Sequence, residues 1–292
     1  MCLSTLRKEL LVENKLIVVV GATGKQGQSV IDALMNNGYR IRALVRNPEK
    51  VASLFPPGVE IFKGDLSDKT SLRLLLDDAY GLFIVLPYSK ESMMYGKVLL
   101  ELAKESNLEH IVYSSVGGAE RYTKVDHYNY KTRVERFLKS LDIPYTILRP
   151  VGYMETFASA KMTKVMTGLL SLYLDANKKF QLISLQDIGR FVEIAFSNPD
   201  KYQGTELEIA GDELSLVELI EKINQLNHVQ LSPMKFPRFT KHLLPKIMKQ
   251  MFTFYADDGW KADIGGLKTA NAKLLSFDDW LSTIDVDTFN KR

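Results

Sequence analysis

The sequence has only one cysteine, Cys2, among its 292 residues. A single cysteine excludes a disulfide within the chain and is typical of a reducing compartment, so we expect a cytoplasmic protein. No apolar run approaches the ~20 residues that a membrane-spanning helix needs. Residues 1–14 mix charges into their few leucines and lack the apolar core of a signal peptide. We therefore expect a loose extension or short helix there, and no membrane partner.

Blocks of one charge are also missing. The formal net charge is +3, and acidic and basic residues are interspersed along the chain. This pattern does not indicate a basic surface for binding nucleic acid. The four histidines are scattered and predict no metal site. The basic segment 235–249 could face an acidic partner or a membrane surface, but a solvated helix is the simpler interpretation.

The sequence does contain three glycines, spaced three apart, directly after the short apolar run 16–20. An amphipathic segment follows them, so the order is strand, glycine turn, helix, which is the context of a dinucleotide fingerprint. Gly21 permits the tight turn, Gly24 lets the backbone approach a pyrophosphate, and Gly27 lets the helix pack close to the strand. The phosphates would then lie at the helix N-terminus, where free N–H groups favour an anion.

Two charged residues further along bear on which dinucleotide would bind. Arg46 stands at the tip of the second expected strand, about twenty residues past the glycines, where an acidic residue usually holds an unmodified ribose. An arginine pairs with a 2′-phosphate instead, so Arg46 favours NADP(H), unless it is a solvated loop residue. Asp65 follows the third strand and could accept from the adenine amino group, or serve as a turn residue or helix N-cap. For Lys25 and Lys50, solvated side chains are the simpler interpretation.

The remaining pattern alternates strands with helices and predicts an α/β fold with a doubly wound parallel sheet. We expect strands at 41–45, 59–62, 81–86, 110–114 and 145–148, and helices from the glycine turn to about 36–38 and at 48–54, 68–76 and 91–106. Residues 15–152 would form this Rossmann domain. Residues 153–292 would form a smaller α+β domain for a substrate or partner. Its expected helices are 186–196 and 215–225, separated by residues 205–209, and parts of this domain can add to the Rossmann sheet.

Several motifs match a known family. They are Gly21-Ala-Thr-Gly-Lys-Gln-Gly27, Leu44-Val-Arg-Asn-Pro48, Gly64-Asp65, Tyr113-Ser-Ser115, Ile143 to Pro150, Ser184 to Ile188, and Phe277 to Leu281. In these motifs the chain resembles the NmrA-like branch of the short-chain dehydrogenase/reductase superfamily over about residues 15–285. The resemblance implies an NAD(P)-binding Rossmann fold, with NADP(H) preferred. The predicted cofactor-binding residues are Gly21, Thr23, Gly24, Lys25, Gln26, Gly27, Arg46, Asp65, Leu66, Leu86, Pro87, Lys131, Tyr153 and Phe157.

The resemblance also implies a degenerate catalytic site. Active members of the superfamily use a serine, a tyrosine and a lysine, with the last two four apart on one helix. Lys131 is present here, but His127 occupies the tyrosine position, and Tyr128 and Tyr130 lie at other spacings. The candidate catalytic residues are therefore Lys131, His127 and Ser114. His127 could donate a proton near neutral pH, although a surface histidine at a helix start is the simpler interpretation. Ser114 could equally satisfy a turn.

Two functions are compatible with these residues. The missing tyrosine favours an NADP(H)-binding redox sensor that reports to a protein partner. The alternative is an NADPH-dependent oxidoreductase for a quinone-like acceptor, because a reduced quinone is a stabilised oxyanion that water can protonate. Tyr153, Met154 and Phe157 could line an apolar pocket with Pro87 and Tyr88, or could be core residues. Action on a nucleotide sugar is less favoured, because no residue of the expected substrate loop specifies it. An oligomer is compatible with the sequence.

Overall fold

The computed structural model describes residues 14–122, 125–227 and 230–291, so the predicted extension 1–14 lies outside it except for Asn14. The chain forms two compact units. Unit 1 comprises the chain up to Ser115 together with Tyr130–Arg149 and Ile188–Leu207; unit 2 comprises Val116–Asn129, Pro150–Asp187 and the chain from Glu208 onward. This division differs from a single boundary after residue 152, because segments on both sides of that point cross from one unit to the other.

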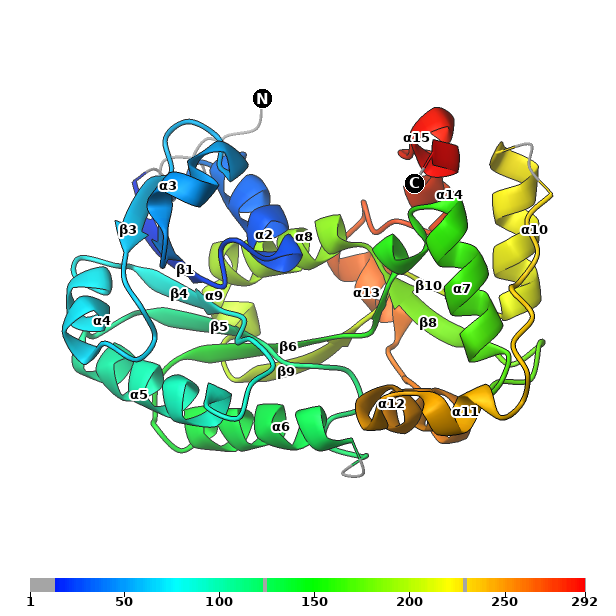
Figure 1. Cartoon of the computed structure of the whole chain (residues 1–292). Helices are drawn as coiled ribbons and strands as arrows, with labels where there is room; N and C mark the ends of the chain where they lie inside the picture. Colours follow the sequence, from blue (N-terminus) through cyan, green and yellow to red (C-terminus); the bar gives the residue numbers. More distant parts are fainter. Residues whose placement is uncertain (1–13, 123–124, 228–229, 292) are drawn as a thin grey trace. The chain divides into compact units, whose positions relative to one another are not determined.

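Unit 1 is built on a seven-stranded sheet with the strand order β3-β2-β1-β4-β5-β6-β9 (Figure 1). Its strands are β1 Leu16–Val20, β2 Arg40–Val45, β3 Glu60–Lys63, β4 Gly81–Ile84, β5 His110–Ser114, β6 Tyr145–Pro150 and β9 Thr205–Ile209. The pairs from β3 through to β6 are parallel. The strand order reverses beside β1, which makes the β1/β4 edge the switch point where open α/β sheets bind ligands. The predicted doubly wound sheet is confirmed.

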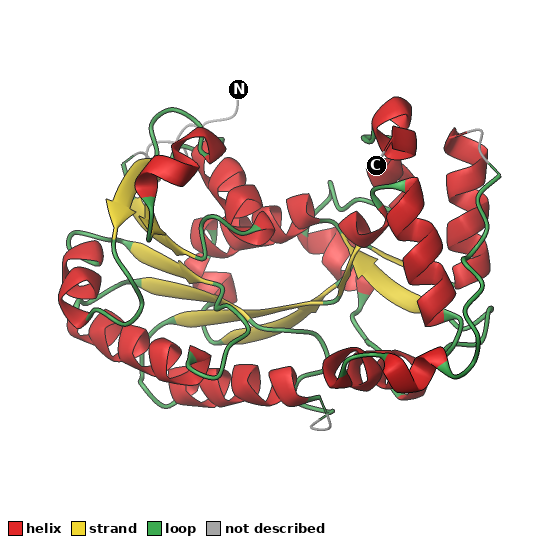
Figure 2. Ribbon diagram, in the orientation of Figure 1, coloured by secondary structure: helices red, strands yellow, loops and turns green. Residues whose placement is uncertain are grey.

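Helices cover both faces of this sheet (Figure 2). Their bounds are α2 Lys25–Met35, α3 Pro48–Val51, η1 Ala52–Leu54, α4 Lys69–Leu75, α5 Ser92–Glu105, α6 Asp126–Lys139, α8 Leu185–Ser197 and α9 Pro199–Tyr202. Alternate residues of β1 face opposite ways, and Val18 and Val20 join a buried cluster with α4, α5 and α6. On the other face α8 packs against α2, since a Cβ at Gly189 would lie 2.3 Å from the Ser29 carbonyl oxygen.

The helix that follows the glycine turn ends where the sequence predicts. Asn36 is its C-cap, and Gly38 has φ +84°, a left-handed conformation that glycine adopts without a steric penalty. The strands lie within a few residues of their predicted positions, because most are short, largely apolar segments that end at Gly, Pro or a polar residue. Among the described residues, no helix is long and apolar enough to cross a membrane.

Unit 2 contains a three-stranded sheet of order β10-β8-β7, in which β7 runs parallel to β8 and β10 runs antiparallel to it. The strands are β7 Gly152–Tyr153, β8 Phe180–Ile183 and β10 Asp212–Leu214. The helices are η2 Met154–Phe157, α7 Ala160–Leu170, α10 Leu216–Asn227, α11 Thr240–Leu243, α12 Lys246–Asp257, α13 Ile264–Ala270, α14 Phe277–Leu281 and α15 Val286–Lys291. These elements give the α+β composition expected for a smaller second domain.

The prediction of one helix over the basic segment 235–249 is wrong. The structure has a single helical turn, α11, then an extended Leu244 with ψ 146°, and only then α12, which begins after Pro245. Steric clash with a proline ring disfavours helical backbone in the residue before it, so Pro245 separates the two helices. Pro245 is the one local signal in the sequence for this break.

A buried ion cluster holds α6 to the sheet in unit 1. Arg149 of β6 donates from Nε and Nη2 to the two carboxylate oxygens of Glu135, at 3.1 and 2.8 Å. Arg149 also contacts Glu206 of β9, whose other oxygen accepts from Lys139 at 2.8 Å. The side chains of Arg149 and Glu135 are only 6% and 2% exposed. The buried guanidinium and carboxylate are tolerated in the interior because each neutralises the charge of the other and satisfies its hydrogen bonds.

Candidate functional site

A cavity of about 560 Å³ opens at the switch point of the unit 1 sheet. The carboxyl ends of β1 to β4 and the loops that follow them supply its walls. The lining residues are Val20, Gly21, Thr23, Gly24, Leu44, Val45, Arg46, Gly64, Asp65, Leu66, Val85, Leu86, Pro87, Ser89, Glu91 and Tyr95. The structure therefore brings eight of the predicted cofactor residues to one place: Gly21, Thr23, Gly24, Arg46, Asp65, Leu66, Leu86 and Pro87.

The glycine turn is as tight as the fingerprint requires. Gly21 has φ +84°, and a Cβ there would lie 2.5 Å from the Val85 carbonyl oxygen. A Cβ on Gly27 would lie 2.3 Å from the Gly21 carbonyl oxygen, so only glycine lets α2 start this close to β1. Gly24 is the N-cap of α2, no side chain caps the helix, and its first turn has no acidic residue. The positive end of this helix is therefore left for an anion in the cavity.

Arg46 and Asp65 lie at the β2–β3 side of the cavity. Arg46 is exposed at the tip of β2. Asp65 accepts from the backbone N–H and the hydroxyl of Ser67, at 2.9 and 2.6 Å. These two hydrogen bonds, with a smaller contribution from the Arg46 charge, lower the pKa of Asp65. Asp65 is thus a turn residue and an ionised acceptor in the cavity wall, whereas the N-cap of α4 is Asp68, which accepts from the Thr70 N–H.

Lys131 of α6 lies buried against the end of β5. Its ammonium donates to the carbonyl oxygens of Ser114 and Ser115, at 2.9 and 3.1 Å. An ammonium has three donors, so these two hydrogen bonds leave one donor uncommitted, and Lys131 does not itself line the unit 1 cavity. Burial lowers the pKa of Lys131 to about 8, against the opposing effect of Glu135 one turn along the helix. Lys131 is therefore fixed and mostly protonated at neutral pH, which suits a group that donates to ribose hydroxyls.

Of the other catalytic candidates, the structure describes the side chain of Ser114. The Ser114 hydroxyl is buried and donates to the Gln26 side-chain oxygen at 2.7 Å, which links β5 to α2. His127 is in α6, but its side chain lies outside the described part of the chain. The Tyr128 ring packs edge-on against Phe254, with centroids 5.4 Å apart, and the Tyr130 ring lies 5.9 Å from that of Tyr88.

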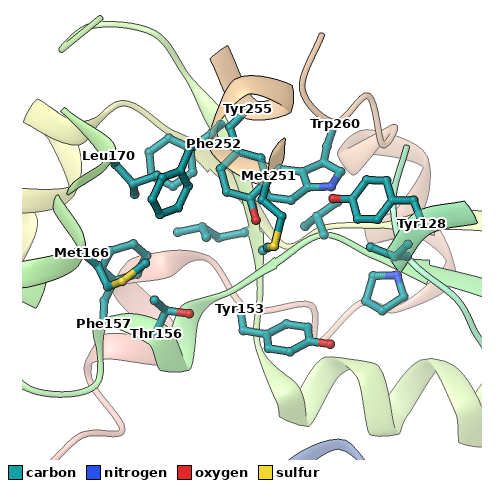
Figure 3. Close-up of a pocket in the computed structure, with 16 residues that line it drawn as sticks. Tyr128, Tyr153, Thr156, Phe157, Met166, Leu170, Met251, Phe252, Tyr255 and Trp260 are labelled. Atoms are coloured by element: carbon teal, nitrogen blue, oxygen red, sulfur yellow. The ribbon is translucent and has the colours of Figure 1, made fainter. Parts of the chain in front are cut away.

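A second cavity, of about 320 Å³, lies within unit 2 (Figure 3). Phe252 and Tyr255 of α12 and the nearby Trp260 face it from one side, with Thr156 and Phe157 opposite. None of its lining residues carries a charge at neutral pH. They are Val116, Tyr128, Pro150, Val151, Gly152, Tyr153, Thr156, Phe157, Met166, Leu170, Phe180, Leu182, Met251, Phe252, Tyr255 and Trp260. Such a surface is suited to an uncharged ring-containing ligand.

The phenols of Tyr128 and Tyr255 in this cavity stay neutral. Burial raises the pKa of both Tyr128 and Tyr255 above the usual value for tyrosine. The Tyr255 and Trp260 rings lie 4.3 Å apart, which fixes both in place. The predicted residues Tyr153 and Phe157 line this cavity, whereas Met154 is a buried core residue. A role for Tyr153 and Phe157 in holding a cofactor stays a prediction.

Sequence reasoning missed the contribution of α12 to this cavity. The signal was the run Met251-Phe252-Thr253-Phe254-Tyr255, in which aromatic residues are too dense for a solvated helix. It also missed Glu91 and Tyr95, which line the unit 1 cavity from the start of α5. Among the described residues, no group of three or more His, Cys, Asp or Glu side chains could hold a metal ion.

A parallel sheet of this order, with a glycine turn and an uncapped helix N-terminus at its switch point, defines an NAD(P)-binding Rossmann fold. Comparison with known families agrees: the model of the NmrA-like family matches residues 13–276. The chain belongs to the NmrA-like family, and the resemblance inferred from its motifs is confirmed.

Relatives within this fold have different described roles. Photosystem II assembly factor Ycf39 of Trieres chinensis is 26% identical over 286 residues, covering 94% of this chain and 86% of that protein. The NADPH complex of the Escherichia coli NADPH-dependent quinone oxidoreductase QOR2 aligns with a TM-score of 0.74 at 21% identity, over 91% of this chain and 98% of that one. The negative transcriptional regulator NmrA, in a structure with NADP, aligns with a TM-score of 0.72 at 19% identity, over 93% of this chain and 95% of that one. At these identities the two structures show the fold alone.

Proposed function

We propose that this protein binds NADP(H) in the unit 1 cavity and reduces a small, uncharged, quinone-like acceptor, the class of ligand that suits the unit 2 cavity. The choice of a quinone-like acceptor rests on the aromatic lining of the unit 2 cavity, in which no side chain is charged. A nucleotide sugar would bring phosphates, and this cavity offers no cation to meet them. The fold that the chain shares with QOR2, a quinone oxidoreductase crystallised with NADPH, supports the same proposal.

In this proposal the protein positions the reactants and supplies little acid–base chemistry. The bound dinucleotide supplies a hydride ion, and one proton from water completes the hydroquinone. The N-terminus of α2 and Arg46 hold the phosphates, and the third donor of Lys131 holds a ribose hydroxyl. The aromatic side chains of the unit 2 cavity, among them Tyr255 and Trp260, would pack against the ring of the acceptor. A simple ketone would need the tyrosine that His127 replaces.

Arg46 should set the choice between NADPH and NADH. We expect wild-type protein to bind NADPH more tightly, and Arg46→Ala to weaken NADPH binding by about 10- to 100-fold through loss of charge-assisted hydrogen bonds. NADH affinity should change little, because that ligand has no 2′-phosphate. Calorimetric titration of both ligands measures this. Lys50→Ala, which removes an exposed cation of the neighbouring α3, is the matched control. Equal or tighter binding of NADH by the wild type would show that the assignment of Arg46 is wrong.

Turnover should depend on the unit 2 cavity. We expect oxidation of NADPH with small quinones and none with simple ketones, measured by the loss of absorbance of the reduced nicotinamide. Thr156→Phe fills the cavity and should raise the KM for the quinone about tenfold or more, with the NADPH dissociation constant unchanged. Met162→Phe adds the same ring at an exposed position of α7, outside the cavity, and should behave as wild type.

The redox sensor is the second candidate, and the histidine at position 127 favours it. It predicts NADPH binding without oxidation by any quinone, together with association with a protein partner that depends on whether NADP+ or NADPH is bound. Tight binding without turnover would therefore reject the reductase and favour the sensor. Failure to bind either dinucleotide would reject both.

A further inference from the structure

Unit 2 contains a long stretch without a single acidic residue, from Lys222 to Ala256. Five of its cations fall between positions 231 and 249: Lys235, Arg238, Lys241, Lys246 and Lys249. Lys246 pairs with Asp126 at 2.8 Å. Within the described residues, no acidic side chain lies within ion-pair distance of Lys235 or Arg238, and both are exposed. Positive charge is therefore left unbalanced around the start of α11.

Apolar side chains are exposed at the same place. Phe239 and Leu243 are 63% and 73% exposed, the highest values for large apolar side chains in the described chain, and Met234 is 44% exposed. Phe239 is the N-cap of α11 and has helical backbone angles, so it and Leu243, four residues apart, share one face of the turn. We call Met234, Lys235, Arg238, Phe239 and Leu243 the basic–apolar patch.

The backbone of the patch is firmly held. The Met234 N–H donates to the Lys164 carbonyl of α7 at 2.8 Å, and a Cβ on Gly168 would lie 2.1 Å from the Met234 carbonyl oxygen. The Lys241 ammonium lies 4.6 Å from the centre of the Tyr173 ring. The segment that carries Phe239 is thus anchored on one side at Met234 and on the other at Lys241.

A groove that three of these cations line lies beside the patch. It has a volume of about 780 Å³ and is lined by Lys235, Arg238 and Lys241, by the hydroxyl residues Ser171 and Ser232, and by apolar neighbours that include Met234. Cations and hydroxyls together suit the phosphate of a lipid headgroup, since both donate hydrogen bonds to its oxygens. The patch therefore offers apolar side chains for the acyl boundary beside donors for headgroups.

We propose that the basic–apolar patch docks this protein on the surface of an anionic phospholipid membrane. Cations alone would fit an acidic protein equally well. Aromatic and leucine side chains projecting between the cations are what an interfacial membrane segment requires, because they partition into the boundary while the cations attract anionic headgroups. Sequence alone favoured a solvated helix here, because it does not show which side chains are exposed.

The test is flotation of the full-length protein with vesicles. We expect binding to phosphatidylcholine vesicles that contain phosphatidylglycerol, weaker binding as salt rises, and little binding to phosphatidylcholine alone. Phe239→Ser with Leu243→Ser, and separately Lys235→Glu with Arg238→Glu, should each lower the partition coefficient about tenfold or more. All four positions are exposed, so each variant should unfold at the wild-type temperature.

Two further measurements separate docking from general charge attraction. Lys104→Glu with Arg136→Glu makes the same change in net charge at exposed positions of unit 1 and should leave vesicle binding unchanged. Phe239→Trp should show a blue shift in emission on anionic vesicles, since Trp260 and Trp280 are both buried. The proposal is overturned if wild type fails to bind anionic vesicles, as for a patch that serves an acidic protein, or if the control reduces binding as much as the patch variants do.

Discussion

Gly27→Ala should lower the free energy of unfolding by about 3 kcal/mol and weaken dinucleotide binding about 100-fold or more. A methyl group at this position would lie 2.3 Å from the Gly21 carbonyl oxygen and 2.7 Å from the Ala22 Cα. Both contacts are with backbone, so no side-chain rotation relieves them. Either α2 moves away from β1 or the turn Gly21–Gly24 changes shape, and each removes the geometry that presents the helix N-terminus to a phosphate. Denaturant titration and calorimetry with NADPH measure the two effects.

Gly38→Ala is the matched control for this substitution. Position 38 favours glycine for a different reason: its φ of +84° is left-handed, whereas nothing lies within 4 Å of the added Cβ. The cost should be only the strain of a left-handed residue, about 1–2 kcal/mol, with NADPH binding unchanged. Wild-type affinity in folded Gly27→Ala protein would contradict the assignment of the glycine turn as the pyrophosphate site.

Much of unit 1 could be predicted because its signals are local. Apolar runs such as 16–20, the three glycines and Arg46 at the tip of a strand all lie close together in the sequence, and the parallel sheet then brings the strand ends to one edge. Contacts between segments that are distant in the sequence could not be predicted. The hydrogen bond from Ser114 to Gln26 joins residues 88 positions apart, and no spacing rule indicates that a serine at a strand end is already committed to a side chain in another helix.

The unit 2 cavity could not be predicted for the same reason. Its walls come from Val116, Tyr128 and the segments 150–182 and 251–260, which are brought together only by packing. Tyr153 and Phe157 were recognised as candidates, but their partners Tyr255 and Trp260 follow a segment interpreted only for its charge. Glu208 shows the effect clearly: it accepts from the N–H groups of Gly118 and Lys261 and pairs with Arg121, joining two loops of unit 2. A single glutamate in the segment 205–209 gives no hint of that role.

Glu135→Ala should be the most destabilising single change in the unit 1 ion cluster, at about 3–5 kcal/mol. It removes the carboxylate that accepts from two nitrogens of Arg149 and leaves that guanidinium, 6% exposed, with Glu206 as its acidic partner. Urea unfolding at neutral pH measures the loss. Glu60→Ala breaks the ion pair with Arg42, where Glu60 is 44% exposed, and should cost less than about 1 kcal/mol. Equal costs for the two variants would show that burial does not govern the strength of these pairs.

Glu135→Gln distinguishes the charge of this residue from its shape, and connects the cluster to the candidate site. The amide fills the same space, but it no longer favours the charged form of Lys131, one helical turn away. The Glu135 charge raises the pKa of Lys131 and partly opposes burial, which brings it to about 8. Without that charge the pKa should fall further, so Lys131 should lose its proton at lower pH. NMR titration of 13C-labelled lysine measures this directly, and NADPH affinity should decline at correspondingly lower pH if Lys131 binds ribose as an ammonium. An unchanged lysine titration in folded Glu135→Gln protein would contradict this coupling, whereas a shifted titration with an unshifted affinity profile would remove Lys131 from the binding site.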